Sequence, residues 1–176
     1  MAAAAPASVR ILGIDPGSRV TGYGLIESAA GRSRCLEHGV IRLGDGPIPQ
    51  RLHHLFTALR DLVERLQPDE AAMEQVFVKD NVSSALVLGQ ARGAAICALG
   101  EAVEGLHEYS PASIKQAVTG SGRADKTQVQ RMVRVLLNLP ATPVADAADA
   151  LACALCHAHS RSYRQKTASV SRSPRR

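Results

Sequence analysis

The hydrophobic positions near the N-terminus occur in short runs, and the turn residues between them are polar. Residues 9–15 are an apolar run that ends in Asp15 and a Pro-Gly pair, which predicts a buried strand followed by a turn. Residues 21–26 and 35–43 are two further strand candidates, separated by a short polar stretch. Three consecutive short strands with tight connections predict an antiparallel meander.

The period of the pattern changes at residue 52, where apolar residues begin to recur every three or four positions. This stripe runs over residues 52–66 and stops before Pro68, so it predicts one amphipathic helix. The later strands are predicted at residues 71–76 and 106–109, and the later helices at residues 83–100, 111–118, 126–137 and 145–160. Three strands come first in the chain, and helices alternate with strands later. This order predicts an α/β fold with a mixed sheet covered by helices.

The charge of the chain is unevenly distributed. The 176 residues suit a single domain and carry a formal charge of +5, but six basic residues and no acidic ones lie in residues 161–176, which leaves −1 for the rest. We therefore expect a short extension over residues 1–8, a globular domain over residues 9–160, and a basic, disordered tail over residues 161–176. The tail is equally well explained as a loose arm for a phosphate backbone and as a solvated terminus.

The sequence shows no sign of export or membrane insertion. No run approaches the roughly 20 apolar residues that cross a bilayer, and the N-terminus lacks the basic and leucine-rich segments of a secretory signal. Four cysteines without an export signal are typical of reduced thiols. These features predict a cytoplasmic protein with no membrane partner.

Four carboxylates are the candidates for chemistry. Asp15 and Glu74 lie near the C-terminal ends of predicted strands, where active-site groups of open α/β sheets gather. Asp146 and Asp149 are three residues apart at the start of a helix, so both project from one face. Four converging acids would repel unless cations occupy the cluster or some groups are protonated, and oxygen ligands favour magnesium or manganese. Taken singly, each acid is also explained as a turn former or as the partner of a helix dipole.

Two other motifs are rejected as functional. Cys153, Cys156 and His157 match the string that attaches c-type haem, but that attachment requires export, and the cysteines occupy small apolar positions suited to packing. A structural zinc site that uses His157 or His159 fits slightly better than haem, but nothing in the sequence requires it. Residues 120–127 look like a phosphate-binding loop, but an aspartate stands where the glycine before the lysine is needed.

An ordered set of motifs identifies a family. Residues 11–24, ILGIDPGSRVTGYG, resemble the opening motif of the RuvC family of Holliday-junction resolvases. The resemblance continues through EQVF at residues 74–77, SAL at 84–86, LGQARG at 88–93, KQ at 115–116, Lys126 with QVQ at 128–130, and ADAADALA at 145–152. It covers about residues 9–159, nearly the whole predicted globular domain.

The resemblance implies a ribonuclease-H-like fold with a five-stranded mixed sheet flanked by helices, and a homodimer that nicks two opposing strands of a four-way DNA junction during recombination and repair. It implies a branch-migration complex of the RuvA and RuvB type as the partner. The four acids match the catalytic, metal-binding residues of the family, with two Mg²⁺ ions per active site for which Mn²⁺ can substitute: Asp15, Glu74, Asp146 and Asp149.

The resemblance also implies DNA-binding residues. Phe77 matches an aromatic that stacks on an unpaired base, and Lys115 and Lys126 match basic residues that contact DNA or assist catalysis. Residues 105–144 carry five basic groups against two acids, a local surplus that favours a DNA-facing surface. Arg123 replaces a small residue of the family's Gly-rich loop and is a further candidate contact.

Two segments depart from the family pattern, and two other functions are weighed. After Phe77 the chain reads Val-Lys-Asp-Asn, where the family more often has an apolar pair before Lys-Asn, so the lysine is displaced to Lys79 and an acid, Asp80, is added. Arg123 is the second departure. One alternative is a junction-binding module without catalysis, which the presence of all four acids argues against. The other is a nucleotide-binding protein of the actin and sugar-kinase superfamily, which needs two such domains where this chain has room for one.

Overall fold

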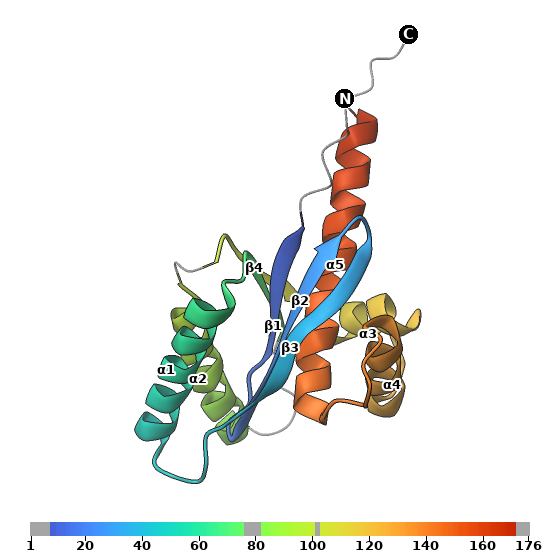
Figure 1. The fold of residues 1–176 in the computed structure, drawn as a ribbon. Coiled ribbons are helices and arrows are strands. Elements are labelled where there is room, and N and C mark those ends of the chain that lie inside the picture. The colour runs from blue at the N-terminus through green and yellow to red at the C-terminus, as the bar shows by residue number, and fades with distance from the viewer. Residues whose placement is uncertain (1–7, 76–81, 101–102, 172–176) are drawn as a thin grey trace.

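The computed structural model describes residues 8–75, 82–100 and 103–171, and it contains one five-stranded sheet in the order β3-β2-β1-β4-β5 (Figure 1). The strands are β1 (Val9–Asp15), β2 (Val20–Ala29), β3 (Arg32–Arg42), β4 (Glu70–Glu74) and β5 (Leu106–Tyr109). The helices are α1 (Ile48–Leu66), α2 (Val82–Leu99), α3 (Pro111–Thr119), α4 (Lys126–Leu136) and α5 (Ala145–Ser171). Strands β1 to β3 form an antiparallel meander, and β4 and β5 run parallel to β1. The predicted α/β class with a mixed sheet is confirmed.

The helices cover the two faces of the sheet in different ways. Helices α1 and α2 pack together on one face, over a hydrophobic core that includes Leu12, Ile14 and Met73. Helix α5 lies along the other face, and α3 and α4 pack on its outer side (Figure 1). Because it lies between the sheet and two helices, α5 is apolar on most of its circumference between Ala147 and Ala158.

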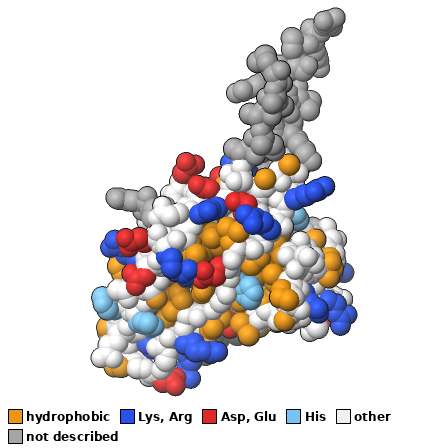
Figure 2. Space-filling view, viewed as in Figure 1, with side chains coloured by type: hydrophobic (Ala, Val, Ile, Leu, Met, Phe, Trp, Pro, Cys, Tyr) orange, Lys and Arg blue, Asp and Glu red, His pale blue; other side chains and the backbone are white. Residues whose placement is uncertain are grey.

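Surface charges on the face shown in Figure 2 are mixed: basic, acidic and hydrophobic side chains are interspersed there without a continuous basic band. Ion pairs also lie at the surface of the described residues, such as Arg65 with Glu37 at 2.7 Å and Arg34 with Glu27 at 2.8 Å. Exposed pairs of this kind contribute at most about 1 kcal/mol each. A DNA-binding surface therefore has to be sought in a local cluster, as the charge count of residues 1–160 indicated.

Helix α5 lies directly on the backbone of β1 and β2 because the facing positions are glycines. A Cβ on Gly13 would lie 1.9 Å from the carbonyl oxygen of Ala150, and a Cβ on Gly22 would lie 1.9 Å from that of Asp146. On Gly24 it would lie 2.5 Å from Cδ2 of Leu151. Gly13 pairs with Gly24 across the two strands, so the glycines form one bare area of the sheet. That area fixes the height and register of α5.

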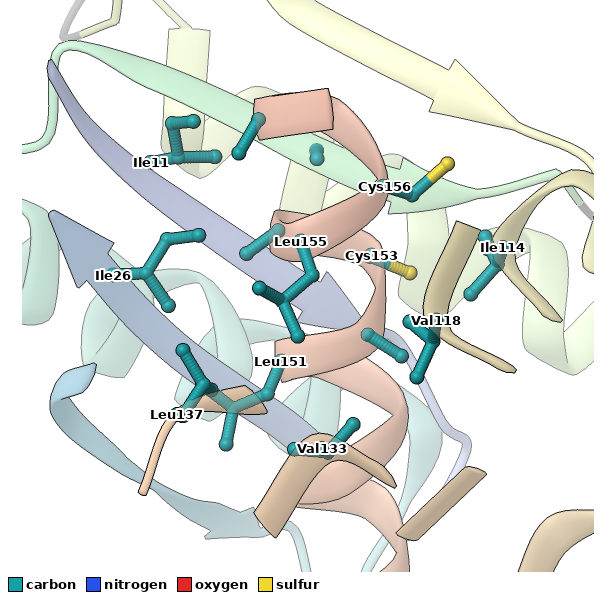
Figure 3. Packing of buried hydrophobic residues seen from close by; sticks show 14 of the residues in the cluster. Ile11, Ile26, Ile114, Val118, Val133, Leu137, Leu151, Cys153, Leu155 and Cys156 are labelled. Atoms are coloured by element: carbon teal, nitrogen blue, oxygen red, sulfur yellow. The ribbon is translucent and has the colours of Figure 1, made fainter. Parts of the chain in front are cut away.

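The core on the α5 side is built by larger residues around this bare area (Figure 3). Leu151 and Leu155 of α5 point towards the strands, where Ile11 and Ile26 lie, whereas Cys153 points towards α3. All four cysteines of the chain are free, and Cys153 is buried. The small apolar positions of this helix thus serve packing, as the sequence predicted for its cysteines.

The predicted disordered tail is corrected in part, because α5 continues through Arg161 to Ser171. No proline or glycine occurs between Ala145 and Ser173, so no residue in that stretch stops the helix. In Figure 1 the last turns of α5 project beyond the sheet. The basic charge of this segment is therefore attached to a helical extension of the domain.

Helix α2 is apolar on all sides but is poorly covered. Its buried residues lie in its second half, between Ala91 and Leu99, whereas Val82 is 69% exposed and Leu86 is 64% exposed. By length and composition alone it is also long and apolar enough to cross a membrane, contrary to the expectation that no segment would be. Core helices of soluble proteins meet the same criterion, so this property is weak evidence for a membrane.

The bare area under α5 yields a test of the fold. Gly22→Ala places a methyl group against the Asp146 carbonyl, so we expect it to lower the free energy of unfolding by about 1–3 kcal/mol or more, as overpacking does. Gly46→Ala is the control, because a Cβ there meets only Gln50 Oε1 at an ordinary 3.5 Å. Urea titrations measure both. Equal stability of the two variants would contradict the close seating of α5.

Candidate active site

Two of the four predicted acids lie side by side at the ends of neighbouring strands. In the parallel pairing of β1 with β4, Ile14 is opposite Met73, and the next residues along the strands are Asp15 and Glu74. The turn after Asp15 is closed by Thr21, whose buried hydroxyl accepts a hydrogen bond from the Gly17 amide at 3.3 Å. The sheet thus places two carboxylates next to each other at one edge.

The other two acids come from the first turns of α5. Asp146 and Asp149 are three residues apart, so they share a face of the helix, and both are partly buried. The Asp146 carbonyl sits against Gly22, which pairs with Asp15 across β1 and β2. The glycine contact therefore brings the start of α5 to the strand ends that carry the first two acids.

The acids lie close enough to raise one another's pKa values. Burial is the main cause that raises the pKa of Asp15 to about 7, and the carboxylates of Asp149, Glu74 and Asp146 add to it. Burial and Asp149 also raise the pKa of Glu74. Burial raises the pKa of Asp149 as well, although the ammonium group of Lys126 opposes the shift. Without a cation, the cluster is therefore held partly in its protonated form.

Lys126, one of the basic residues that the resemblance nominated, borders the acids. Lys126 Nζ lies 3.5 Å from Asp149 Oδ2, and the carboxylates, Asp149 first, raise the pKa of Lys126. The helix start places this lysine: Asp125 accepts a hydrogen bond from the Gln128 amide at 2.8 Å, and the Gln128 side chain accepts one from the Asp125 amide at 3.1 Å. The aspartate that argued against a phosphate loop is thus the N-cap of α4.

A cavity of about 310 Å³ opens between the acids and helices α3 and α4. It is lined by Glu74, Pro111, Ile114, Lys115, Lys126, Val129 and Asp149. The lining therefore combines acidic, basic and apolar side chains. Sequence reasoning missed the apolar part of this lining, because Ile114 and Val129 are ordinary core positions of amphipathic helices and only the fold brings them to the cavity.

Among the described residues, one predicted DNA contact is not brought to the acids. Arg123 is exposed in the loop before α4 and does not line the cavity. Phe77, Lys79 and Asp80 lie outside the described residues.

The four acids fit a hard divalent cation by their chemistry, since they offer carboxylate oxygens and their mutual repulsion needs a positive charge. The structure also holds a possible metal-binding group of acidic and histidine side chains. Within the described part of the chain, Glu70, His107 and His157 have ligand atoms that all lie within 4.8 Å of one another. This group is distinct from the four acids.

Comparisons with known proteins agree with the geometry. Residues 11–157 match the family model described as crossover junction endodeoxyribonuclease RuvC. The chain is 57% identical over 150 residues to the protein of that name from Alkalilimnicola ehrlichii, covering 85% of this chain and 91% of that protein. It is 50% identical to the protein of that name from Magnetococcus marinus, covering 95% and 92%.

Solved structures show the same likeness. A structure described as Thermus thermophilus RuvC in complex with Holliday junction substrate matches with a TM-score of 0.80 and 33% identity, covering 88% of this chain and 96% of that one. The yeast mitochondrial Holliday junction resolvase Ydc2 matches in fold, with a TM-score of 0.61 and 14% identity over 90% and 86% of the two chains.

The raised pKa of Asp15 predicts that the free energy of unfolding depends on pH. The folded protein holds this proton up to about pH 7, whereas the unfolded chain releases it near pH 4, so stability falls as the pH rises through that window. In chelator, Asp15→Asn should match wild type near pH 4 and exceed it by as much as about 4 kcal/mol at pH 8. Urea unfolding at both pH values measures this. A wild type that is the more stable of the two at pH 8 would contradict the burial of a repelled carboxylate.

Proposed function

Because the chain belongs to the RuvC family of crossover junction endodeoxyribonucleases, we propose that Asp15, Glu74, Asp146 and Asp149 are the catalytic centre with which it cuts four-way DNA junctions. The observation that carries the assignment is the meeting of two strand-end acids with two acids from the first turns of α5. The substrate agrees with the junction-bound Thermus thermophilus structure to which the chain is similar.

The four carboxylates are the groups that would hold Mg²⁺, with Mn²⁺ as a substitute. Two bound ions would supply charge stabilisation for the attacking and leaving oxygens of a phosphodiester. The chain's own residues do the rest. Asp15 is nearly buried and fixed by the turn behind it, so it is a rigid ligand rather than a mobile one.

The lysines at the cavity supply a positive charge for the phosphate. Lys126 lies beside Asp149, and Lys115 faces the same cavity, so both can pair with a scissile phosphate that lies over the acids. When that phosphate arrives, the Lys126 ammonium exchanges an exposed carboxylate contact for a phosphate contact. Arg123 is proposed to contact the backbone further out, and Phe77 to stack on a base near the crossover, as the family resemblance implies.

A homodimer through α2 would give the two coordinated cuts that a junction needs. Val82 and Leu86 leave apolar surface uncovered on the first half of this helix. A Cβ on Gly89 or Gly93 would meet nothing within 4 Å, so the small residues leave room for a partner helix to approach. An uncovered apolar face on an otherwise well-packed domain is typical of a subunit interface. We propose in addition a cytoplasmic setting and a branch-migration complex as partner.

The catalytic assignment predicts the effect of removing single carboxylates. Asp15→Asn and Glu74→Gln should each lower the rate of cutting a synthetic four-way junction with Mg²⁺ by at least about a hundredfold, because each loses a charge that supports the transition state. Junction binding should remain, as measured by gel shift. The control is Glu64→Gln, an exposed acid of α1.

Full cutting by Glu74→Gln or Asp146→Asn would overturn the four-acid scheme. Binding of the junction by wild type without any cutting would instead favour a non-catalytic junction-binding module.

The dimer assignment predicts a different effect from a surface change. Leu86→Glu should convert the dimer to a monomer, because it places a charge in the proposed apolar interface, and the monomer should make single rather than paired nicks. Val135→Glu is a matched control, since Val135 lies on α4 and is also 64% exposed. Sedimentation measures the mass. A Leu86→Glu protein that stays dimeric would exclude α2 as the interface.

A further inference from the structure

A polar cluster lies at the end of the sheet opposite the catalytic acids. Alternate residues of a strand face the same side, and Ala72 of β4 faces the α5 core, so Glu70 and Glu74 face that side too. Across β5, His107 pairs with Ala72 and Tyr109 with Glu74. The fold thus directs Glu70, His107 and Tyr109 towards α5, and the Tyr109 side chain reaches from beside Glu74 to His157.

His157 of α5 is the centre of the cluster. Its side chain is completely buried, its Nε2 donates to Oε2 of Glu70, and its Nδ1 accepts from the Tyr109 hydroxyl at 2.6 Å. The His107 ring stacks on it, with centroids 4.1 Å apart and planes 19° from parallel. Arg161 Nε donates to the other carboxylate oxygen, Oε1 of Glu70, at 2.9 Å.

The cluster is separate from the catalytic acids. Glu70 and Glu74 are four residues apart along β4, which is about 13 Å of extended chain. His157 lies eight residues beyond Asp149 on α5, which is about 12 Å of helix. No residue is shared between the two groups, and the ligands differ in kind.

We propose that Glu70, His107 and His157 bind one transition-metal ion of the Zn²⁺ class, in a site distinct from the catalytic centre. The donor atoms of the three side chains already lie within 4.8 Å of one another, so side-chain rotation alone can bring them around one ion. Two imidazoles and one carboxylate form a ligand set that zinc favours and that magnesium does not. Water would fill the fourth position.

The surroundings prepare two of the three ligands. Arg161 occupies Oε1 of Glu70, which leaves Oε2 directed at His157. The Tyr109 hydroxyl fixes the orientation of the His157 ring through Nδ1. A hydrogen-bonded second nitrogen on a ligating histidine is the usual arrangement at metal sites, because it fixes both the tautomer and the ring.

Binding requires two local changes. The proton on His157 Nε2 moves to Nδ1, where the Tyr109 oxygen accepts it, so the imidazole stays neutral and Nε2 becomes a ligand. His107 must leave its stacked position, because nearly parallel rings direct their nitrogen lone pairs side by side rather than at one point. His107 is partly exposed whereas His157 is buried, so the His107 ring has room to turn.

The ion would join three elements that are distant in sequence. Glu70 starts β4, His107 lies in β5 and His157 lies in the middle of α5, so the site would fasten α5 to the far edge of the sheet. Its effect is therefore expected in stability rather than in the chemistry of the cut. That expectation makes the site testable without a DNA substrate.

The test measures bound zinc in chelator-treated, full-length protein that is dialysed against Zn²⁺ with Mg²⁺ in excess. His107→Phe keeps a ring stacked on His157 and keeps all four catalytic acids, so its difference from wild type reports this site alone. We expect one zinc equivalent fewer in His107→Phe and in Glu70→Gln. His54→Ala, an exposed histidine of α1, is the control and should match wild type.

Two further readouts complete the test. Zn²⁺ should raise the Tm of wild type more than that of His107→Phe, since an ion that binds only the folded state stabilises it. Tyr109→Phe should retain the site with about 10–100-fold weaker zinc affinity, because it loses only the hydrogen bond to Nδ1. Equal zinc content and equal Tm shifts in wild type, His107→Phe and Glu70→Gln would overturn the proposal and leave the cluster as a hydrogen-bonded network.

Discussion

The contact between α5 and the bare backbone of β1 and β2 is the constraint on which the site depends. Gly13 and Gly22 let two turns of the helix rest directly on the sheet, with carbonyl oxygens of Ala150 and Asp146 where side chains would otherwise stand. No side-chain layer intervenes, so the distance from helix to sheet is set by backbone van der Waals contact, which has little compliance. The first turns of α5 are thereby held beside the strand ends, where Asp146 and Asp149 lie close enough to Asp15 to raise its pKa.

That placement assembles the acid cluster, but it lowers the stability of the folded protein. Burial and three neighbouring carboxylates oppose the ionisation of Asp15, and the exposed Lys126 compensates only in part. A core of this kind tolerates the conflict because the hydrophobic contacts around Leu151 and Leu155 do not depend on the charge state of the acids. Unfavourable interactions of this kind, confined to one place in an otherwise well-packed domain, are typical of a functional site. The same conflict makes this cluster a suitable place for a cation, because a positive charge there would relieve the repulsion among the carboxylates.

The features that depend on local sequence, namely most helices and strands and two of the candidate acids, could be predicted. Strand and helix periodicity located nearly every element, and the positions of Asp15 and Glu74 after apolar strands were enough to nominate them. The family resemblance joined the four acids into one site, which spacing could not do. What the sequence could not reveal depends on contacts between distant segments. These are the packing of α5 on Gly13 and Gly22, which lie within predicted strands, and the pairing of Glu70 with His157 across 87 positions. The length of α5 was underestimated because basic composition was weighed above the absence of any helix-stopping residue.

Strand β4 explains how one sheet supports two unlike groups of side chains. Its α5-facing row is Glu70, Ala72 and Glu74, with a small residue in the middle where α5 packs closely and an acid at each end. The two glutamates have the same chemistry, so their different surroundings come from α5, which presents Asp149 near one and His157 and Arg161 near the other. Around Glu74 the added groups are carboxylates, and the sum is an oxygen-rich, negative site that suits a hard cation. Around Glu70 they are nitrogen donors, of which the imidazoles suit a softer ion. Since α5 is a single helix seated on glycines, the register that delivers the aspartates to Glu74 also delivers the histidine to Glu70, and neither end can shift without the other.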